Sequence, residues 1–327
     1  MVSIIMPIYN GQDTMRCAIE SVRNQTYSDI QLIIVNDGST DKTLEIIQKY
    51  AVSDERVRYF SQPNAGQAAA RNFGLSKAEG EYVQFLDCDD TLESDAIETL
   101  VRQLSAHPKA SFVLFGFNVY AGEQLLRTPN PGDGYFAAGS GYNSFRPVEK
   151  LMASPCNKLY RRNYIKVLFD EKMVFGEDSV FNYANLTNET EVVLCSRCLY
   201  NVQLGTENSV NKRYKKGKLS DVLMSRRLEE QVMSKLFPGD FDVERFRKNE
   251  LSTVAFTVYM CSIKLAEDDA AEEMRIASSE STYLAELLKY TNSARLHDKL
   301  LLYPMKGKKY LAVIKRSKML RIIRSLR

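Results

Sequence analysis

Short apolar runs alternate with helical patterns through the first hundred residues. The runs at 2–8, 31–35, 57–60 and 82–86 predict buried strands. Helices are expected between and after them, at 13–25, 40–50, 67–77 and 94–106; in the first, Met15, Ala18, Ile19 and Val22 have the spacing of one helix face. This alternation predicts an α/β domain with a parallel, doubly wound sheet flanked by helices.

The pattern changes further along the chain. Residues 111–120 predict another strand, and residues 128–144, rich in Gly, Pro and Asn, predict a mobile loop. From about residue 219, long helical patterns take over at 219–236, 243–266 and 270–290. We therefore expect an α/β domain over residues 1–215 and a smaller α-helical accessory domain over residues 216–327.

Polar clusters follow three of the predicted strands, at residues 7–11, 36–41 and 87–90. Ligands of doubly wound folds bind outside the carboxyl ends of the strands, so the clusters should meet in one crevice. In an extended segment Asp87 and Asp89 project to the same side while Cys88 points away. Two carboxylates so placed suit one hard cation or one ligand hydroxyl, although acidic turns after strands are also common.

Composition narrows the classes of protein. No apolar stretch approaches the length of a membrane span, and no charged segment precedes the first strand, so we expect a cytoplasmic protein without a signal peptide. Six scattered cysteines are typical of reduced thiols; Cys195 and Cys198, three apart in a predicted strand, should face opposite ways rather than bind metal. With two histidines in 327 residues, a histidine-rich metal site or a His-based triad is not expected.

Charge is concentrated at the C-terminus. Residues 304–327 hold nine of the 44 Lys and Arg residues and none of the 41 acids, so the rest is net acidic. Apolar residues, among them Leu311, Ile314 and Met319, alternate with these cations, which is typical of a helix on the anionic inner face of a membrane. The alternative is a solvated helix packed on its own domain. Nucleic-acid binding is not expected, since no recognition motif accompanies the tail.

Five motifs together carry a resemblance to a known family. They occupy residues 2–10, 34–41, 64–74 and 87–90, and end with Gly176-Glu177-Asp178. In this order and spacing the chain resembles the inverting glycosyltransferases of family 2, which have the GT-A fold, in the bacterial type with a C-terminal helical domain. The resemblance covers about residues 1–210. It implies a metal-dependent enzyme whose donor is a UDP-sugar and whose cation is Mn²⁺ or Mg²⁺.

The resemblance also suggests roles for individual residues. Nucleotide binding is implied for seven: Pro7, Tyr9, Asp37, Asn64, Arg71, Asp87 and Cys88. From its chemistry, Tyr9 suits stacking on a base and Arg71 suits a diphosphate or Asp87; the alternatives are a core-edge tyrosine and a helix-surface arginine. By resemblance, Asp89 binds the metal. Asp90 is expected to serve local structure.

The remaining assignments concern transfer itself. Asp178 is expected to be the general base that inversion requires, although acids there also suit a helix N-terminus. Glu177 and Lys158 are placed at the acceptor or sugar, and Ser209 in a loop over the diphosphate, where Gln203 and Glu207 replace the family's usual basic residues.

The function predicted from the sequence is transfer of a hexose or N-acetylhexosamine, with galactose or glucose preferred, from a UDP-sugar to a hydroxyl of a glycan, glycolipid or glycoprotein. The alternatives are a sugar-nucleotide nucleotidyltransferase and a non-catalytic glycan-binding protein on the same fold. The sequence leaves the sugar, the acceptor and the oligomeric state open.

Overall fold

The computed structural model describes residues 1–137, 140–204 and 214–325. The chain divides into two compact units: Met1–Glu171 with Asp178–Thr206, and Lys172–Glu177 with Glu207–Arg327. The contacts thus assign a short segment ahead of residue 178 to the second unit, which the sequence-based boundary after residue 215 did not anticipate.

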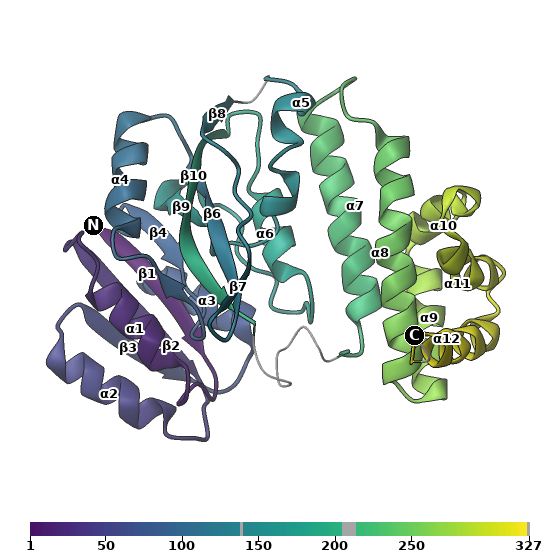
Figure 1. Ribbon diagram of the computed structural model, residues 1–327, viewed down its shortest axis with the longest axis horizontal. Helices are drawn as coiled ribbons and strands as arrows, with labels where there is room; N and C mark the ends of the chain where they lie inside the picture. Colours follow the sequence, from purple (N-terminus) through teal and green to yellow (C-terminus); the bar gives the residue numbers. More distant parts are fainter. Residues whose placement is uncertain (138–139, 205–213, 326–327) are drawn as a thin grey trace. The chain divides into compact units, whose positions relative to one another are not determined.

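A mixed sheet forms the centre of the first unit (Figure 1). Within the described residues its path is β3-β2-β1-β4-β9-β6-β10-β5, with β7 beside β6 and β8 beside β10. The strands are β1 (Val2–Ile8), β2 (Ile30–Asp37), β3 (Val57–Gln62), β4 (Tyr82–Phe85), β5 (Thr91–Leu92), β6 (Phe112–Ala121), β7 (Gln124–Arg127), β8 (Gly134–Ala137), β9 (Lys158–Arg161) and β10 (Glu191–Gln203).

The parallel part of the sheet follows the sequence pattern closely. Strands β1 to β4 are mutually parallel, with β1 between β2 and β4, and every residue of β1 and β2 is buried. Burial on both faces explains why these strands read as continuous apolar runs. Because the chain moves from β1 to β2 and β3 and then returns to the other side of β1, the strand order reverses between β1 and β4. The predicted α/β architecture is confirmed.

The antiparallel strands are the ones that the sequence pattern did not identify. Strand β9 runs antiparallel to both β4 and β6, and β8 pairs with β10 inside the segment that was expected to be a mobile loop. Strands β5, β7, β8 and β9 are four residues long or shorter, too short to show a clear period. The 128–144 segment is therefore partly a strand, and its helix α5 begins at Tyr142.

Helix α3 is held close to the sheet by a glycine. It packs on β1 and β2, and a Cβ added at Gly74 would come within 2.4 Å of the Ile5 side chain. This close approach fixes the helix that carries Arg71. The helices of this part of the chain are α1 (Met15–Arg23), α2 (Thr43–Ser53), α3 (Gln67–Lys77), α4 (Ala96–Ala106), α5 (Tyr142–Phe145) and α6 (Glu177–Ala184), with 3-10 turns at Glu149–Leu151 and Arg162–Tyr164.

The second unit is helical, as the sequence predicted, around a core to which all its long helices contribute. The expected single helix over 270–290 is two helices, because the Ser281 side chain accepts the amide of Leu284 and starts a new one. No helix in the described residues combines the length and apolar content of a membrane span. The helices are α7 (Lys218–Leu236), α8 (Val243–Lys264), α9 (Glu267–Glu280), α10 (Thr282–Leu288), α11 (Leu296–Lys306) and α12 (Tyr310–Ser325), with a 3-10 turn at Thr291–Ser293.

Candidate active site

Tyr9 and the Asp87 cluster flank the point where the strand order reverses. Tyr9 follows β1 and is 52% exposed, and Asp87 lies two residues beyond the end of β4. Open α/β sheets bind their ligands at such a switch point, because the loops on either side diverge there and leave room. The sheet topology therefore places an exposed aromatic ring and a group of carboxylates at the two sides of one ligand-binding position.

Asp37 organises the neighbouring loop. Its buried carboxylate accepts from Gln62 Nε2 at 2.8 Å, from the amide of Ala65 at 2.9 Å and from that of Gly66 at 2.8 Å. Asn64 Nδ2 in turn donates to the Asp37 carbonyl at 2.9 Å. Asp37 and Asn64 thus hold each other's loops in place. Since Oδ2 of Asp37 accepts one described hydrogen bond, it retains capacity for a ligand N–H.

Arg71 joins two carboxylates that lie far apart in the sequence. Its side chain is 1% exposed, and Nη2 lies 2.9 Å from Asp87 Oδ1 while Nη1 lies 2.5 Å from Asp178 Oδ1. The guanidinium also lies 5.3 Å from the Phe169 ring centroid. About a third of each carboxylate side chain remains exposed. A buried planar cation thereby fixes two accessible acids at one edge of the site.

The turn after β4 divides into residues with different surroundings. Asp87 Oδ1 also accepts from Gln67 Nε2 at 2.9 Å. Asp90 is buried and accepts from the Tyr200 hydroxyl and the Gln203 amide, both at 2.8 Å. Burial and the charges of Asp87 and Asp89 raise the pKa of Asp90 to about 8. The expected local structural role of Asp90 agrees with these bonds, which tie the turn to β10.

The Cys88 side chain lies beside the segment that follows β1. A Cβ added at Gly11 would meet its Sγ at 3.4 Å, and burial raises the pKa of the thiol to about 12. The thiol is therefore neutral and turned toward the residues after β1. Pro7, the last residue but one of β1, is buried in the sheet.

Asp89 is an exposed residue of the turn after β4. Protein packed around the carboxylate and the charge of Asp87 raise its pKa. Within the described residues no three His, Cys, Asp or Glu side chains gather as a metal cluster. This donor set fits Mg²⁺ or Mn²⁺, which bind through one or two carboxylates and complete their coordination with ligand phosphates and water.

Asp178 lies in the first turn of α6, where the helix dipole favours a negative charge. The helix is anchored by Asn182, whose Nδ2 donates to the Asp178 carbonyl at 2.9 Å and to the Ala153 carbonyl at 3.2 Å. Phe181 stacks on Phe169 with 4.0 Å between ring centroids. The position of Asp178 is thus fixed both by the ion pair of its side chain and by the anchoring of its helix. Glu177 immediately precedes it at the helix start.

Lys158 requires a correction. Its ammonium is fully buried and donates to the carbonyls of Leu151 and Ser154 at 3.0 and 2.5 Å and to Asn157 Oδ1 at 2.9 Å. Burial lowers its pKa to about 7. Direct contact with an acceptor or sugar, as predicted, is wrong for this arrangement, because the amine faces the 151–157 segment. Lys158 holds the 151–157 segment, whose Ala153 carbonyl accepts from Asn182 of α6.

Two residues of the site were missed in the sequence. Gln67, the first residue of α3, donates to Asp87, and Tyr200 both accepts the Asp87 amide at 3.1 Å and donates to Asp90. The glutamine had a signal, since it follows Gly66 within a recognised motif, whereas the tyrosine depends on strand pairing between β10 and β5. Ser209 lies outside the described residues.

An α/β unit with a group of carboxylates at the switch point of its sheet has the architecture of a ligand-binding enzyme. The model of the family Glycosyl transferase family 2 matches residues 3–169, about half of the chain. The chain therefore belongs to glycosyl transferase family 2 and is a glycosyltransferase by family. The matched segment contains Tyr9, Asp37, Arg71 and Asp89.

Relatives differ in how much of their length is shared. Glycosyltransferase GlyA of Streptococcus pneumoniae is 31% identical over 209 residues, which are 61% of this chain but 30% of that protein. An uncharacterized glycosyltransferase of Haemophilus influenzae is 39% identical over 169 residues, 51% of this chain and 67% of that one. EpsJ of Bacillus subtilis, also an uncharacterized glycosyltransferase, is 29% identical over 277 residues, 81% of this chain and 76% of that protein.

Solved structures share the fold. S. aureus TarS 1-349, crystallised in complex with UDP-GlcNAc, is 18% identical with a TM-score of 0.67, covering 98% of this chain and 91% of that one. The mannosyltransferase PcManGT of Pyrobaculum calidifontis, in complex with GDP-Man and Mn²⁺, is 16% identical with a TM-score of 0.51, covering 97% and 86%. At these identities the likeness concerns the fold, and the predicted GT-A architecture with a helical C-terminal region is confirmed.

Proposed function

We propose that this glycosyltransferase moves a hexose or N-acetylhexosamine, with inversion, from a UDP-sugar to a hydroxyl group of a glycan, glycolipid or glycoprotein, with the help of a divalent cation. The observation that carries the proposal is the double ion pair of Arg71, which joins Asp87 at the end of β4 to Asp178 at the start of α6. One guanidinium thus links the carboxylate nearest the donor position to a second acid suited to proton transfer.

The donor side is built from the loops at the switch point. Tyr9, half-exposed, offers a ring for stacking on a base, and Asp37 Oδ2 can accept a base imino group beside it. A uracil presents such an N–H. Asp87 would contact the ribose or the sugar with its exposed oxygen, while Gln67 and Arg71 hold the other oxygen in place. TarS in complex with UDP-GlcNAc supports this choice of donor class.

Asp89 is the protein ligand that we assign to Mn²⁺ or Mg²⁺. A cation bound there would stabilise the negative charge that grows on the departing nucleoside diphosphate. Asp90 contributes orientation: its bonds to Tyr200 and Gln203 fix the turn against β10, which helps to keep the Asp89 carboxylate at the surface of the site. A neighbour in fold carries Mn²⁺ with its donor, which supports a divalent cation.

Asp178 is the proposed general base. In an inverting transfer one carboxylate takes the proton from the acceptor hydroxyl as that oxygen attacks the anomeric carbon from the face opposite the leaving group. The pairing with Arg71 and the helix N-terminus both favour the ionised carboxylate, the form that a base needs. Glu177, which precedes Asp178 in the sequence, is proposed to orient the acceptor.

Two other functions have less support. A sugar-nucleotide nucleotidyltransferase would use a Gly-rich, basic triphosphate-binding stretch after β1, where this chain has Tyr9-Asn10-Gly11-Gln12. A non-catalytic glycan-binding protein would not need a carboxylate held beside the donor by a buried arginine.

Release of UDP from a panel of UDP-sugars, with Mn²⁺ and with a chelator, tests the proposal. The expected result is metal-dependent release from one or two sugars, and a fall of about 100-fold or more for Asp89→Asn. Asp240→Asn, an exposed acid of the helical unit, is the matched control. Release of pyrophosphate from a nucleoside triphosphate and a sugar phosphate would support the nucleotidyltransferase instead. Binding of a glycan without turnover of any donor would contradict an enzyme.

A further inference from the structure

The last helix of the second unit, α12, is packed into the unit through one face. Val313 and Ile314 are fully buried in the helical core, and the helix contacts α8, α9 and α11. Lys318 pairs with Glu267 at 3.0 Å, and Arg316 Nη1 donates to the Leu300 carbonyl at 3.0 Å. From the sequence pattern, Ile314 was expected to face a membrane surface. In the structure it is buried in the core of its own unit instead.

The opposite face of α12 carries a row in which apolar and basic side chains alternate. Leu311, Lys315 and Met319 follow each other at four-residue spacing, so they share one side of the helix. Leu311 is 56% exposed and Met319 is 47% exposed. Lys309, just before the helix, and Arg316 and Lys318 within it are exposed beside this row. We call these six residues the outer stripe.

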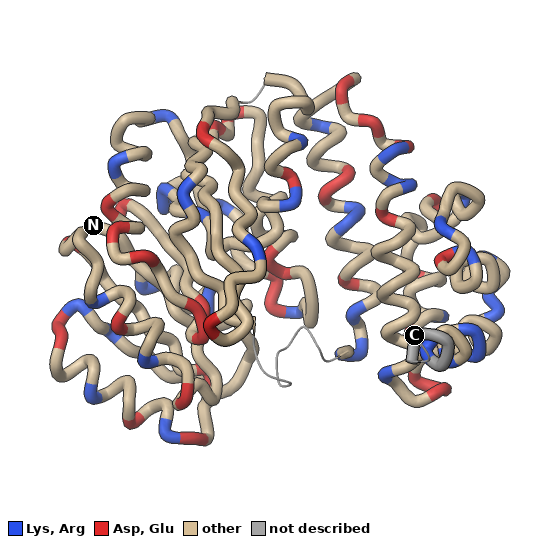
Figure 2. The backbone as a smooth tube through the Cα atoms, viewed as in Figure 1, with Lys and Arg blue, Asp and Glu red and all other residues tan. Residues whose placement is uncertain are grey.

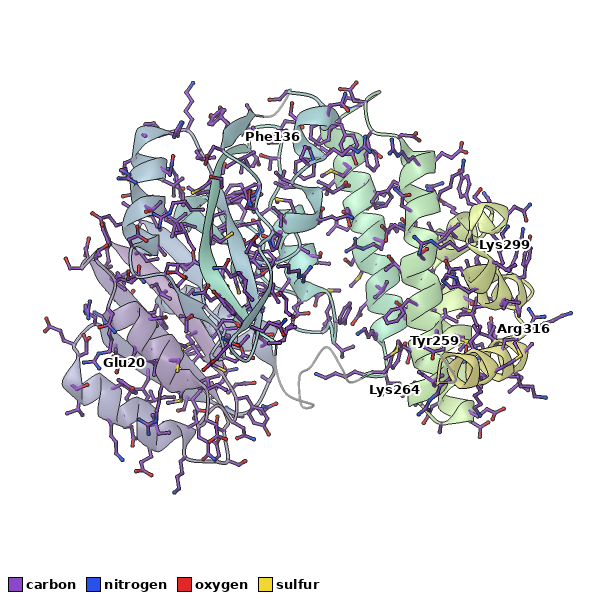
Figure 3. The ribbon with its side chains drawn as sticks, viewed as in Figure 1. Glu20, Phe136, Tyr259, Lys264, Lys299 and Arg316 are labelled. Carbon is purple, nitrogen blue, oxygen red and sulfur yellow. The ribbon has the colours of Figure 1, made fainter. Side chains whose placement is uncertain are left out.

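The charged residues in and around the outer stripe are almost all basic. Helix α12 contains no Asp or Glu, and residues 295–321 contain nine Lys or Arg and a single acid, Asp298, which is buried. Basic positions recur along α11 and α12 in Figure 2, and Figure 3 labels Lys299 and Arg316 on these two helices. Within the described residues, Lys309 and Lys315 have no ion-pair partner.

We propose that the outer stripe binds an anionic phospholipid surface. The cations would meet the lipid phosphates, and Leu311 and Met319 would enter the boundary between head groups and acyl chains. Docking would take place with α12 folded on its unit, because releasing the helix would expose Val313 and Ile314. The inference concerns the location of the protein and does not rest on the proposed donor or base.

The test measures partitioning of the full chain onto vesicles of phosphatidylcholine with and without phosphatidylglycerol. Wild type should sediment with the anionic vesicles and not with the neutral ones, and high salt should release it. Each cation near such a surface strengthens binding by about five-fold, so Lys309→Gln, Lys315→Gln and Arg316→Gln together should weaken partitioning by about 100-fold. Leu311→Gln with Met319→Gln should weaken it by about ten-fold.

Matched controls separate the outer stripe from net charge and from exposed apolar area. Lys235→Gln, Lys264→Gln and Lys289→Gln remove the same charge from exposed positions on other helices or turns of the same unit, and Val52→Gln removes an exposed apolar side chain of α2. These variants should bind as wild type does. UDP release without acceptor should be unchanged in every variant, which separates this test from the proposed function.

Three outcomes would overturn the proposal: failure of wild type to bind anionic vesicles, equal binding to neutral ones, or equal loss in the stripe and control triple variants. A fourth is tight binding of wild type to duplex DNA or single-stranded RNA that the stripe variant loses, with no vesicle binding. That result would assign the outer stripe to nucleic acid.

Discussion

Nη1 of Arg71 lies 2.5 Å from Oδ1 of Asp178, although the two residues are 107 positions apart in the sequence. The same guanidinium holds Asp87 through Nη2 at 2.9 Å. Helix α3, strand β4 and helix α6 thus converge on a single buried side chain. The proposed donor contact and the proposed base share one support, so a change in Arg71 should disturb both.

Replacing Arg71 with lysine should therefore reduce activity strongly, although the positive charge is kept. A lysine ammonium is a single point and cannot make two directed contacts to separate carboxylates. We expect kcat/KM for donor turnover to fall by about 100-fold, with a lower melting temperature. Arg58→Lys, at an exposed pair with Glu79, is the control and should leave both unchanged. Retention of more than half of the activity in Arg71→Lys would show that the bridge is dispensable.

Tyr9 should contribute to nucleotide affinity through its ring. Stacking of a base on an aromatic side chain contributes about 1–3 kcal/mol, so Tyr9→Ala should weaken UDP binding by about five-fold or more. Tyr9→Phe keeps the ring and should bind as wild type does. Titration calorimetry with UDP measures both, with Tyr59→Ala on β3 as a control for loss of a partly exposed tyrosine. Equal affinity of the alanine and phenylalanine variants would exclude stacking.

Lys158 should act on catalysis through the 151–157 segment. Lys158→Met leaves the carbonyls of Leu151 and Ser154 without their donor, which should destabilise the protein by about 2 kcal/mol or more. Because the segment contacts α6 through Asn182, kcat should fall while KM for the donor stays close to wild type. The control is Lys150→Met, an exposed lysine beside the same segment. A rise in donor KM with normal kcat would contradict positioning.

The same lysine gives the stability a pH dependence. Burial lowers the pKa of Lys158 to about 7 in the folded protein, whereas an unfolded lysine titrates near 10.4. Between these values the unfolded chain binds the extra proton, so the contribution of Lys158 to stability grows as pH rises from 7 to 10 and is least below 7. The slope is at most about 1.4 kcal/mol per pH unit. Urea unfolding at pH 7 and pH 9 should show the stability difference between wild type and Lys158→Met widening; parallel curves would contradict it.

The sequence predicted those parts of the site that depend on local pattern. Apolar runs located β1, β2, β3 and β4, and the polar residues after them marked Tyr9, Asp37 and Asp87. These are strand-end positions, which the point where each apolar run stops reveals without coordinates. The bridge from Arg71 to Asp178 was not predicted, because the sequence offered Asp87 or a diphosphate as its partners and contains no signal of a contact across 107 residues.

Burial explains the other differences between the sequence-based predictions and the structure. Nothing in Asn157-Lys158 distinguishes an acceptor-side lysine from one enclosed by carbonyls, since β9 is four residues long and its neighbours come from distant strands. Ile314 had the spacing of an exposed amphipathic face, and only packing with α8 and α9 shows it in the core. In both cases the side chain's environment is set by tertiary contacts.

Turnover by Asp178→Asn, measured beside its affinity for UDP, tests the central claim most directly. The amide keeps the size of the side chain and an oxygen for Arg71, but it cannot accept the acceptor's proton. General base catalysis contributes about 10² to 10⁴-fold, so sugar transfer should fall by at least about 100-fold while UDP affinity stays within about two-fold of wild type. Near-normal transfer in this variant would contradict Asp178 as the base, and with it the mechanism proposed for this site.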